Sequence, residues 1–316
     1  MADARRIDVH FHIIPDFYRD AVYAAGSGPA IGRYPDWSPE RALELMDASG
    51  IELAVTSLAQ PGVQFAPAAA ARTLARRCND YAAELSARWP RRFGAFAVVP
   101  MHDLDDAVAE IRYCSETLRF AGACLFASYG EKFLGDSRFD PVLAALNERD
   151  AVVFIHPAYH PSSRALDLPW PGFMMEYLFD TTRAAVNLLL SGAMDRFPRI
   201  RFILAHAGGV LPYFAWRLSV APMIDPRLPQ WPRERILAGL RRYWYDIALS
   251  PGPGTMGALA AIAAPERILY GSDWPFANAR VVAEALKDYT AEDFLTPPQR
   301  AGIDRGNALA LLPRFA

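Results

Sequence analysis

Lysine is almost absent from this chain of 316 residues, which contains only Lys132 and Lys287, so arginine supplies nearly all of its positive charge. The planar guanidinium of arginine suits carboxylate recognition better than an ammonium group does. With 33 basic and 35 acidic residues, the formal net charge is −2. No basic surplus is available to attract nucleic acid or an anionic membrane, so we expect neither as a partner.

Long apolar runs are also missing. The sequence contains no stretch of 18 or more apolar residues, so no membrane-spanning helix is predicted. Its first ten residues, MADARRIDVH, lack the apolar core of a signal peptide. The three cysteines, Cys78, Cys114 and Cys124, are widely spaced and odd in number. They indicate buried thiols rather than a metal knuckle. We therefore expect a cytoplasmic protein.

Short apolar segments recur along the chain, and stretches with helical spacing separate them. The predicted strands span 6–12, 52–58, 93–99, 122–126, 151–156, 200–206, 243–248 and 267–272. Eight alternating strand and helix units favour an α/β fold, a single (β/α)8 TIM-type barrel with inserted loops and extra C-terminal helices. A doubly wound open sheet is the rival fold, and two smaller domains are the alternative to one.

Local signals mark the helices and loops between these strands. In SPERALELMDASG, Ser38 is the expected N-cap, Pro39 the first helical residue and Gly50 the stop. Two segments rich in proline and aromatic or polar residues, 159–177 and 221–235, read as long loops.

Four of the predicted strands end in residue types that bind metal ions. His10 and His12 close the first strand, His156 the fifth, His206 the sixth and Asp273 the eighth. Residues two apart on a strand face the same side, so His10 and His12 can both point into the barrel. The carboxyl ends of barrel strands meet on one face, and closure brings the first strand beside the eighth. Converging imidazoles and a carboxylate predict a divalent-metal site and an enzyme, with a structural polar cluster or noncatalytic metal as the alternative.

These strand ends and their surroundings resemble the amidohydrolase superfamily, in particular its aminocarboxymuconate-semialdehyde decarboxylase-like branch (amidohydrolase 2). The resemblance covers nearly the whole chain and includes DVHFHIIP, EYLFDTTRAAVNLLLSG, DRFPRIRFILAHAGGVLPYFAWRL, RILYGSDWPF and GNALALL. Several of these blocks look most like 6-methylsalicylate decarboxylase-type members. The resemblance implies a single metal-dependent barrel domain over residues 1–316 that forms a homodimer or higher homo-oligomer.

The resemblance also implies site residues. One divalent metal would be bound by His10, His12, His156 and Asp273. His206 would then lie beside the metal as an acid or base. Members with two metals often use a carboxylated lysine at the end of strand four, whereas here Lys132 follows that strand by several residues, which favours one metal. Three nitrogens and one oxygen favour zinc, with manganese as the alternative if the substrate supplies oxygen ligands.

Two arginines are expected to hold a substrate carboxylate. The resemblance implies that Arg217 reaches into a partner subunit's site and that Arg33, in GRYPDWSPE, is a second substrate-binding residue. The segment GGVLPYFAWRL should form a helix just past His206. Arg217 would then lie roughly 16 Å along it, too far to fold back to its own metal. Interface or surface ion pairs are the alternative roles.

The favoured function is nonoxidative decarboxylation of a small aromatic or unsaturated carboxylic acid, such as a salicylate-type compound. Asp273 or His206 would deliver a proton to the ring carbon. Aromatic residues of the expected active-site loops would wall a flat substrate; they are Phe11, Trp170, Phe173 and Trp274. The rival class is a metal-dependent lactonase or hydratase, because such a metal can also activate water. A binding protein without turnover is the third possibility.

Overall fold

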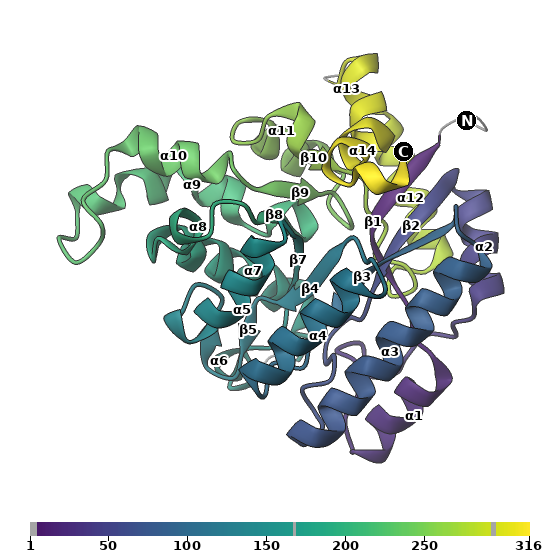
Figure 1. Ribbon diagram of the computed structural model, residues 1–316. Helices are drawn as coiled ribbons and strands as arrows, with labels where there is room; N and C mark the ends of the chain where they lie inside the picture. The colour runs from purple at the N-terminus through teal and green to yellow at the C-terminus, as the bar shows by residue number, and fades with distance from the viewer. Residues whose placement is uncertain (1–4, 167–168, 292–294) are drawn as a thin grey trace.

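Eight parallel strands surrounded by helices form the core of the computed structural model, which describes residues 5–166, 169–291 and 295–316 (Figure 1). The strands are β1 Arg6–His12, β2 Ile51–Ser57, β3 Phe93–Val98, β4 Gly122–Phe126, β7 Val152–His156, β8 Arg201–Leu204, β9 Trp244–Asp246 and β10 Ile268–Leu269. They pair in chain order, β1-β2-β3-β4-β7-β8-β9-β10. This order confirms the predicted barrel, because a doubly wound sheet would reverse direction at a switch point.

The barrel closes through an irregular segment that follows β10. The backbone N–H of Val9 donates to the carbonyl of Tyr270 at 3.1 Å, and the N–H of His12 donates to that of Trp274 at 2.7 Å. Between them, the N–H of Asp273 donates to the carbonyl of His10 at 2.8 Å. Strand β1 is therefore hydrogen-bonded to the segment that follows β10, and these bonds close the barrel.

Two apolar clusters hold the strands in place. The inner cluster fills the barrel with side chains such as Phe96 and Phe154, whose rings stack with centroids 5.7 Å apart. At the end of the barrel where the strands begin, this cluster includes Leu311 of α14 (Asn307–Leu311), which closes that end. The outer cluster lies between the strands and the helices around them. Because both faces of each strand are covered, the strands are nearly continuous apolar runs.

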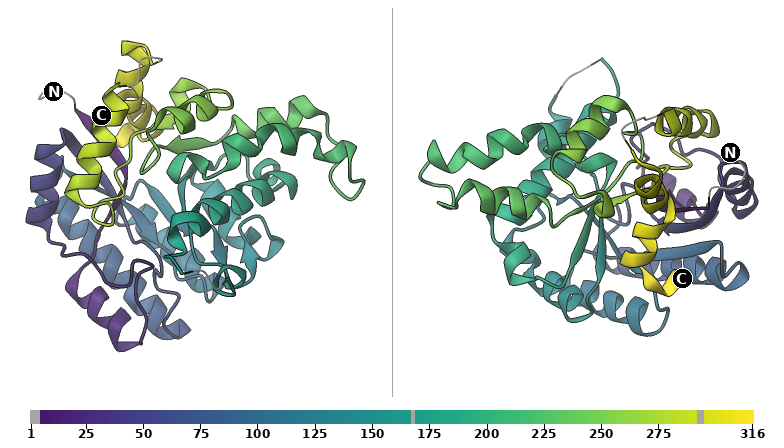
Figure 2. Two further views of the ribbon diagram at one scale, coloured as in Figure 1. Left: turned by 180° about the vertical axis from the view of Figure 1, so that it is seen from behind. Right: turned by 90° about the horizontal axis from the view of Figure 1, so that it is seen from above.

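The helices alternate with the strands as predicted (Figures 1 and 2). Before β7 they are α1 Asp16–Ala24, α2 Pro39–Ala48, α3 Ala68–Arg88, α4 Leu104–Glu116 and α5 Asp140–Glu148. After β7 they are α6 Pro161–Arg164, α7 Phe173–Leu190, α8 Ala193–Arg196, α9 Leu211–Val220, α10 Arg233–Leu240, α11 Pro253–Ala260, α12 Ala279–Ala291 and α13 Pro297–Ala301, followed by α14. Helix α2 has the expected ends: the Ser38 hydroxyl accepts the N–H of Arg41, and Gly50 follows with a positive φ. Among the described residues, no helix is long and apolar enough to cross a membrane.

Several predicted boundaries were wrong. The strands predicted at 200–206, 243–248 and 267–272 end two to three residues earlier, at Leu204, Asp246 and Leu269. His206 and Asp273 have positive φ values, which an extended strand cannot accommodate. The loop predicted at 159–177 contains α6 and the first turn of α7, and residues 167–168 within it lie outside the described residues. The loop predicted at 221–235 contains a 3-10 turn, Ala221–Met223, and the start of α10.

Candidate metal centre

A bulge in β1 turns its two histidines toward the barrel interior. Between Asp8 and Phe11, β1 contains one residue more than β2, with which it pairs. Val9 packs in the inner cluster, while Phe11 packs in the outer cluster. Neighbouring residues of a regular strand face opposite sides, so the extra residue lets His10 and His12 follow Val9 to the inside.

Asp273 and His206 belong to tight turns beyond the strands. Their φ values are 65° and 55°, and Ala207 and Leu249 nearby also have positive φ. These are four of the six non-glycine residues with positive φ in the described part of the chain. Such conformations cost energy and persist where surrounding contacts enforce them, which is common at functional sites.

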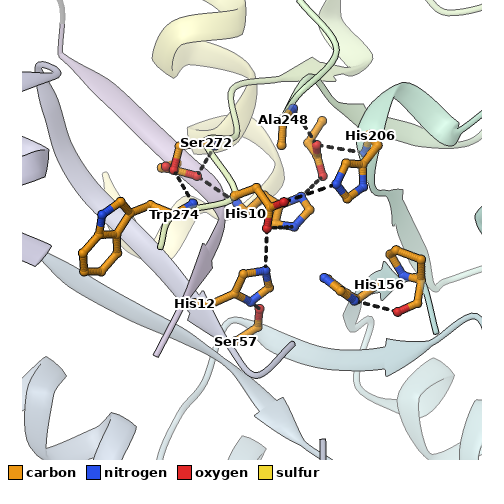
Figure 3. Close-up of polar contacts among 12 residues, drawn as sticks. His10, His12, Ser57, His156, His206, Ala248, Ser272 and Trp274 are labelled. Atoms are coloured by element: carbon orange, nitrogen blue, oxygen red, sulfur yellow. Dashed lines mark hydrogen bonds and ion pairs between the residues drawn. The ribbon is translucent and has the colours of Figure 1, made fainter. Parts of the chain in front are cut away.

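The side chains from β1, β7 and the two turns meet at one point (Figure 3). Asp273 Oδ1 lies 3.0 Å from His12 Nε2 and 3.2 Å from His10 Nε2, and Asp273 Oδ2 lies 3.5 Å from His206 Nε2. The His156 ring centroid is 5.4 Å from that of His10 and 5.0 Å from that of His12. All five side chains are nearly or fully buried.

Hydrogen bonds on the far side of each imidazole fix its orientation. His156 Nδ1 donates to the carbonyl of Pro157 at 2.8 Å, and His10 Nδ1 donates to Asp246 Oδ2 at 3.0 Å. Carbonyl and carboxylate oxygens only accept, so each Nδ1 carries a proton, and Nε2 is the ring nitrogen that is left to bind a metal. His12 Nδ1 lies 3.1 Å from the Ser57 hydroxyl, which can accept or donate.

Four residues fit one divalent cation. The candidate ligand atoms of His10, His12, His156 and Asp273 lie within 4.8 Å of one another. His10 Nε2 is buried without a hydrogen-bond partner although it is 3.2 Å from a carboxylate oxygen, as expected of a group aimed at a shared ion. Three imidazole nitrogens and one carboxylate oxygen are a donor set that zinc and manganese accept.

The protonation states of the site agree with this donor set. Burial lowers the pKa values of His12 and His206 and holds that of His156 well below its ordinary value. These imidazoles are therefore neutral, the form that binds metal. Although burial raises the pKa of Asp273, the nearby His10 and His12 outweigh burial and hold it well below 3.8. His10 is the exception: burial lowers its pKa, yet Asp246 and Asp273 raise it to about 10, so without an ion His10 carries the positive charge itself, and a bound cation would take the place of its Nε2 proton.

A cavity of about 240 Å³ opens directly above these groups. His156, His206 and Asp273 form its polar floor, and Gln60 and Ser250 add two further polar groups. Most of the wall is apolar and comes from Ile31, Phe173, Met174, Tyr177, Leu178, Leu249 and Phe276. A small flat molecule with polar groups on one edge fits such a lining.

The remaining predicted site residues lie elsewhere. Arg217 and Arg33 are exposed, and neither lines this cavity. Lys132 lies in the hairpin of β5 (Ser128–Tyr129) and β6 (Lys132–Phe133), where it pairs with Asp136 at 3.2 Å. Of the aromatic residues, Phe173 lines the cavity. Trp170 does not, and Phe11 packs against Trp274 with ring centroids 4.9 Å apart, because the bulge turns Phe11 outward.

Asp246 is a charged residue of the site that was not predicted from the sequence. It ends β9 and is fully buried, and its carboxylate contacts His10. The signal was present, since Asp246 follows the aromatic run YWY inside a predicted strand, as His156 follows an apolar run. Because the strand was predicted to extend to 248, Asp246 was placed inside it and was not recognised as a strand-end residue.

Comparison with known proteins connects the site to a family. The sequence profile of the family described as Amidohydrolase matches residues 7–314. The chain is 36% identical over 315 residues to 6-methylsalicylic acid decarboxylase of Penicillium expansum, covering 98% of this chain and 97% of that protein. It is 38% identical over 323 residues to 6-methylsalicylic acid decarboxylase of Aspergillus aculeatus, covering 98% and 96%. Among solved structures, a dihydroxybenzoic acid decarboxylase from Polaromonas sp., with bound manganese and the inhibitor 2-nitroresorcinol, is similar with a TM-score of 0.79 at 25% identity, covering 98% and 97%.

Proposed function

Because this chain belongs to the amidohydrolase family, we propose that it is a metal-dependent nonoxidative decarboxylase of a small aromatic carboxylic acid of the salicylate type. The observation that carries the proposal is the cluster of three histidines and an aspartate, two of which, His156 and Asp273, line the floor of an apolar cavity. The decarboxylases to which the chain is similar over almost its whole length support the reaction class.

The residues that would hold the metal are His10, His12, His156 and Asp273. When bound there, a divalent ion supplies Lewis acidity, attracting substrate oxygens and stabilising negative charge. The nitrogen-rich donor set supports zinc, and the manganese bound by the Polaromonas protein supports manganese as the alternative. Elemental analysis of protein purified from cells supplied with both metals distinguishes the two.

The cavity suits a single aromatic ring. Its volume of about 240 Å³ lies below the roughly 300–1,000 Å³ of pockets for drug-sized ligands. Phe173 and Phe276 supply aromatic wall, so the ring of the substrate would lie among apolar side chains. Its carboxylate and neighbouring hydroxyl would then face the polar floor.

The chain supplies the proton that the reaction needs. Decarboxylation begins when the ring carbon that bears the carboxylate gains a proton. The bond to the carboxylate then breaks, its electron pair returns to the ring, and carbon dioxide leaves. His206 is the proposed carrier, because its Nδ1 has no hydrogen-bond partner and its side chain lines the cavity. Because His206 is neutral and Asp273 is ionised at rest, His206 would first take up a proton from solvent, and Asp273 Oδ2, 3.5 Å from His206 Nε2, is placed to exchange that proton with it.

Recognition of the carboxylate by Arg217 would require a second copy of the chain. Arg217 lies near the end of α9, a helix that projects from the barrel with α10 (Figures 1 and 2). The same helix exposes Tyr213 by 85% and Trp216 by 66%, an apolar surface that supports a homodimer contact. We propose that Arg217 enters the partner's site there. Arg33, two residues beyond the cavity-lining Ile31, would bind the acid at the entrance.

Product analysis tests this function. Protein loaded with zinc or manganese should release carbon dioxide from 6-methylsalicylate or 2,6-dihydroxybenzoate. In deuterium oxide the product should carry one deuteron at the carbon that lost the carboxylate. A His156→Ala variant is the matched control and should bind less metal and release less carbon dioxide. Ring opening of lactones or hydration of enoic acids, without carbon dioxide release from any aromatic acid, would assign the protein to the rival class.

A further inference from the structure

Asp246 accepts three N–H groups at the bottom of the site. Its Oδ2 accepts His10 Nδ1 at 3.0 Å, and its Oδ1 accepts the backbone N–H groups of His206 at 3.1 Å and Ala248 at 2.9 Å. None of its surface is exposed. It does not line the cavity, so no substrate reaches it.

The three proposed histidine ligands have partners of different chemistry. His12 faces the hydroxyl of Ser57, and His156 faces the backbone carbonyl of Pro157. Only His10 has a carboxylate at Nδ1, the ring nitrogen that points away from the metal. A carboxylate behind a metal-binding histidine fixes the position of the ring proton and makes the other ring nitrogen a stronger ligand. Asp246 therefore affects His10 more strongly than the neutral partners affect the other two ligands.

The other oxygen of Asp246 holds the turn that carries the proposed proton carrier. His206 and Ala207 both have φ values of 55°, a conformation that costs energy for residues with a side chain. The N–H of His206 is bound by Asp246 at the start of this turn, and the N–H of Gly209 donates to the carbonyl of His206 at 2.9 Å. Removing the carboxylate would release the first of these two restraints.

We propose that Asp246 is a positioning residue that aims His10 Nε2 at the metal and holds the His206 turn against it. The two oxygens of one side chain thus couple the metal ligand of β1 to the turn after β8, which lie 196 positions apart in the sequence. This inference rests on the proposed metal site. Asp246 would touch neither the metal nor the substrate, yet it would determine the positions of His10 and His206.

Metal affinity, measured without substrate, tests the inference separately from the reaction. Competition with a chromophoric chelator would give the dissociation constant for Zn²⁺ of the wild type and of Asp246→Asn and Asp246→Glu. Loss of an orienting partner of this kind typically weakens metal binding by about 10–100-fold, so that loss is expected for asparagine. Glutamate keeps the charge and should recover part of the affinity.

Two matched variants separate this role from the loss of any buried polar group. Asp180→Asn replaces another fully buried aspartate, which binds the Ser128 hydroxyl and the N–H of Ala158 and should leave Zn²⁺ affinity within about threefold. Ser57→Ala removes the neutral partner of His12 and should weaken binding less than Asp246→Asn does.

A nitrogen-15 histidine spectrum supplies a readout that a purely structural role would not change. In Asp246→Asn, the ring resonances of one histidine should show mixed Nδ1–H and Nε2–H forms, while circular dichroism stays that of the wild type. Unchanged affinity and unchanged ring resonances in Asp246→Asn, with wild-type metal binding intact, would overturn the inference alone. Absence of metal binding by the wild type would instead overturn the proposed function.

Discussion

Replacing His206 by alanine or glutamine should slow decarboxylation while leaving the metal bound. The His206 side chain lies outside the group of four candidate ligands, and its Nε2 is 3.5 Å from Asp273 Oδ2. The substitution also spares the backbone N–H that donates to Asp246. The turn and the ligands should therefore keep their positions.

The expected loss in kcat is about 10²–10⁴-fold, the usual contribution of a general acid or base. This corresponds to roughly 3–5 kcal/mol in the activation barrier. The folding cost should stay within the ordinary range of about 0.5–3 kcal/mol, because Nδ1 has no hydrogen bond to lose. The side chain would lose its packing, such as that against the ring of His10 at 4.8 Å, and the 3.5 Å approach of Nε2 to Asp273.

Three measurements on each variant decide the matter: carbon dioxide release, metal content after gel filtration, and the midpoint of urea unfolding. Glutamine is the closer replacement, since its amide fills part of the space of the imidazole but transfers no proton. If metal content falls in proportion to activity, His206 is a ligand and its assignment as proton carrier is wrong. A rate within tenfold of the wild type would show that another group supplies the proton.

Chelation should abolish carbon dioxide release, and free Zn²⁺ at 100 times its dissociation constant should restore it and add about 2.7 kcal/mol to the free energy of unfolding, read from urea curves. An Arg217→Ala chain mixed with an His10→Ala chain should recover about one quarter of wild-type activity, because half of randomly mixed dimers contain one complete site of two; no recovery after verified exchange would refute action across subunits. Burial raises the pKa of Asp180 to about 7, whereas in the unfolded chain this carboxyl group loses its proton at lower pH. The free energy of unfolding therefore falls as the pH rises toward 7. The stability of Asp180→Asn relative to the wild type should therefore increase by roughly 2–3 kcal/mol between pH 5 and pH 8, and a constant difference would contradict the shift.

The sequence was sufficient for the order of the strands and for the residues that meet at their carboxyl ends. Each strand is a short apolar run, and His156 terminates one of them before a proline, which cannot extend a ladder. In a closed parallel barrel all carboxyl ends meet on one face, so residues at those ends are neighbours whatever their separation in the chain. The convergence of His10, His12, His156 and Asp273 was predictable for that reason.

Tertiary contacts decided what the local pattern could not encode. The hydrogen bond that orients His10 joins it to Asp246, 236 positions away, and the carboxylate beside His12 Nε2 belongs to Asp273, 261 positions away. The extra residue in β1 that turns both histidines inward is visible only against the register of β2. Neither fact follows from the composition of a single segment.

From the sequence came the barrel and the strand-end residues of the candidate metal site, because alternating apolar runs and the residues that end them are local properties; the expectation of an acid-binding arginine came from the resemblance to a family. Only the folded chain placed Arg217 and Arg33 outside the cavity, built the cavity wall from α7 and the turn after β9, and set Asp246 behind His10. Those features depend on how turns with positive φ and distant helices pack together. Such packing is determined by contacts between segments that no single stretch of sequence contains.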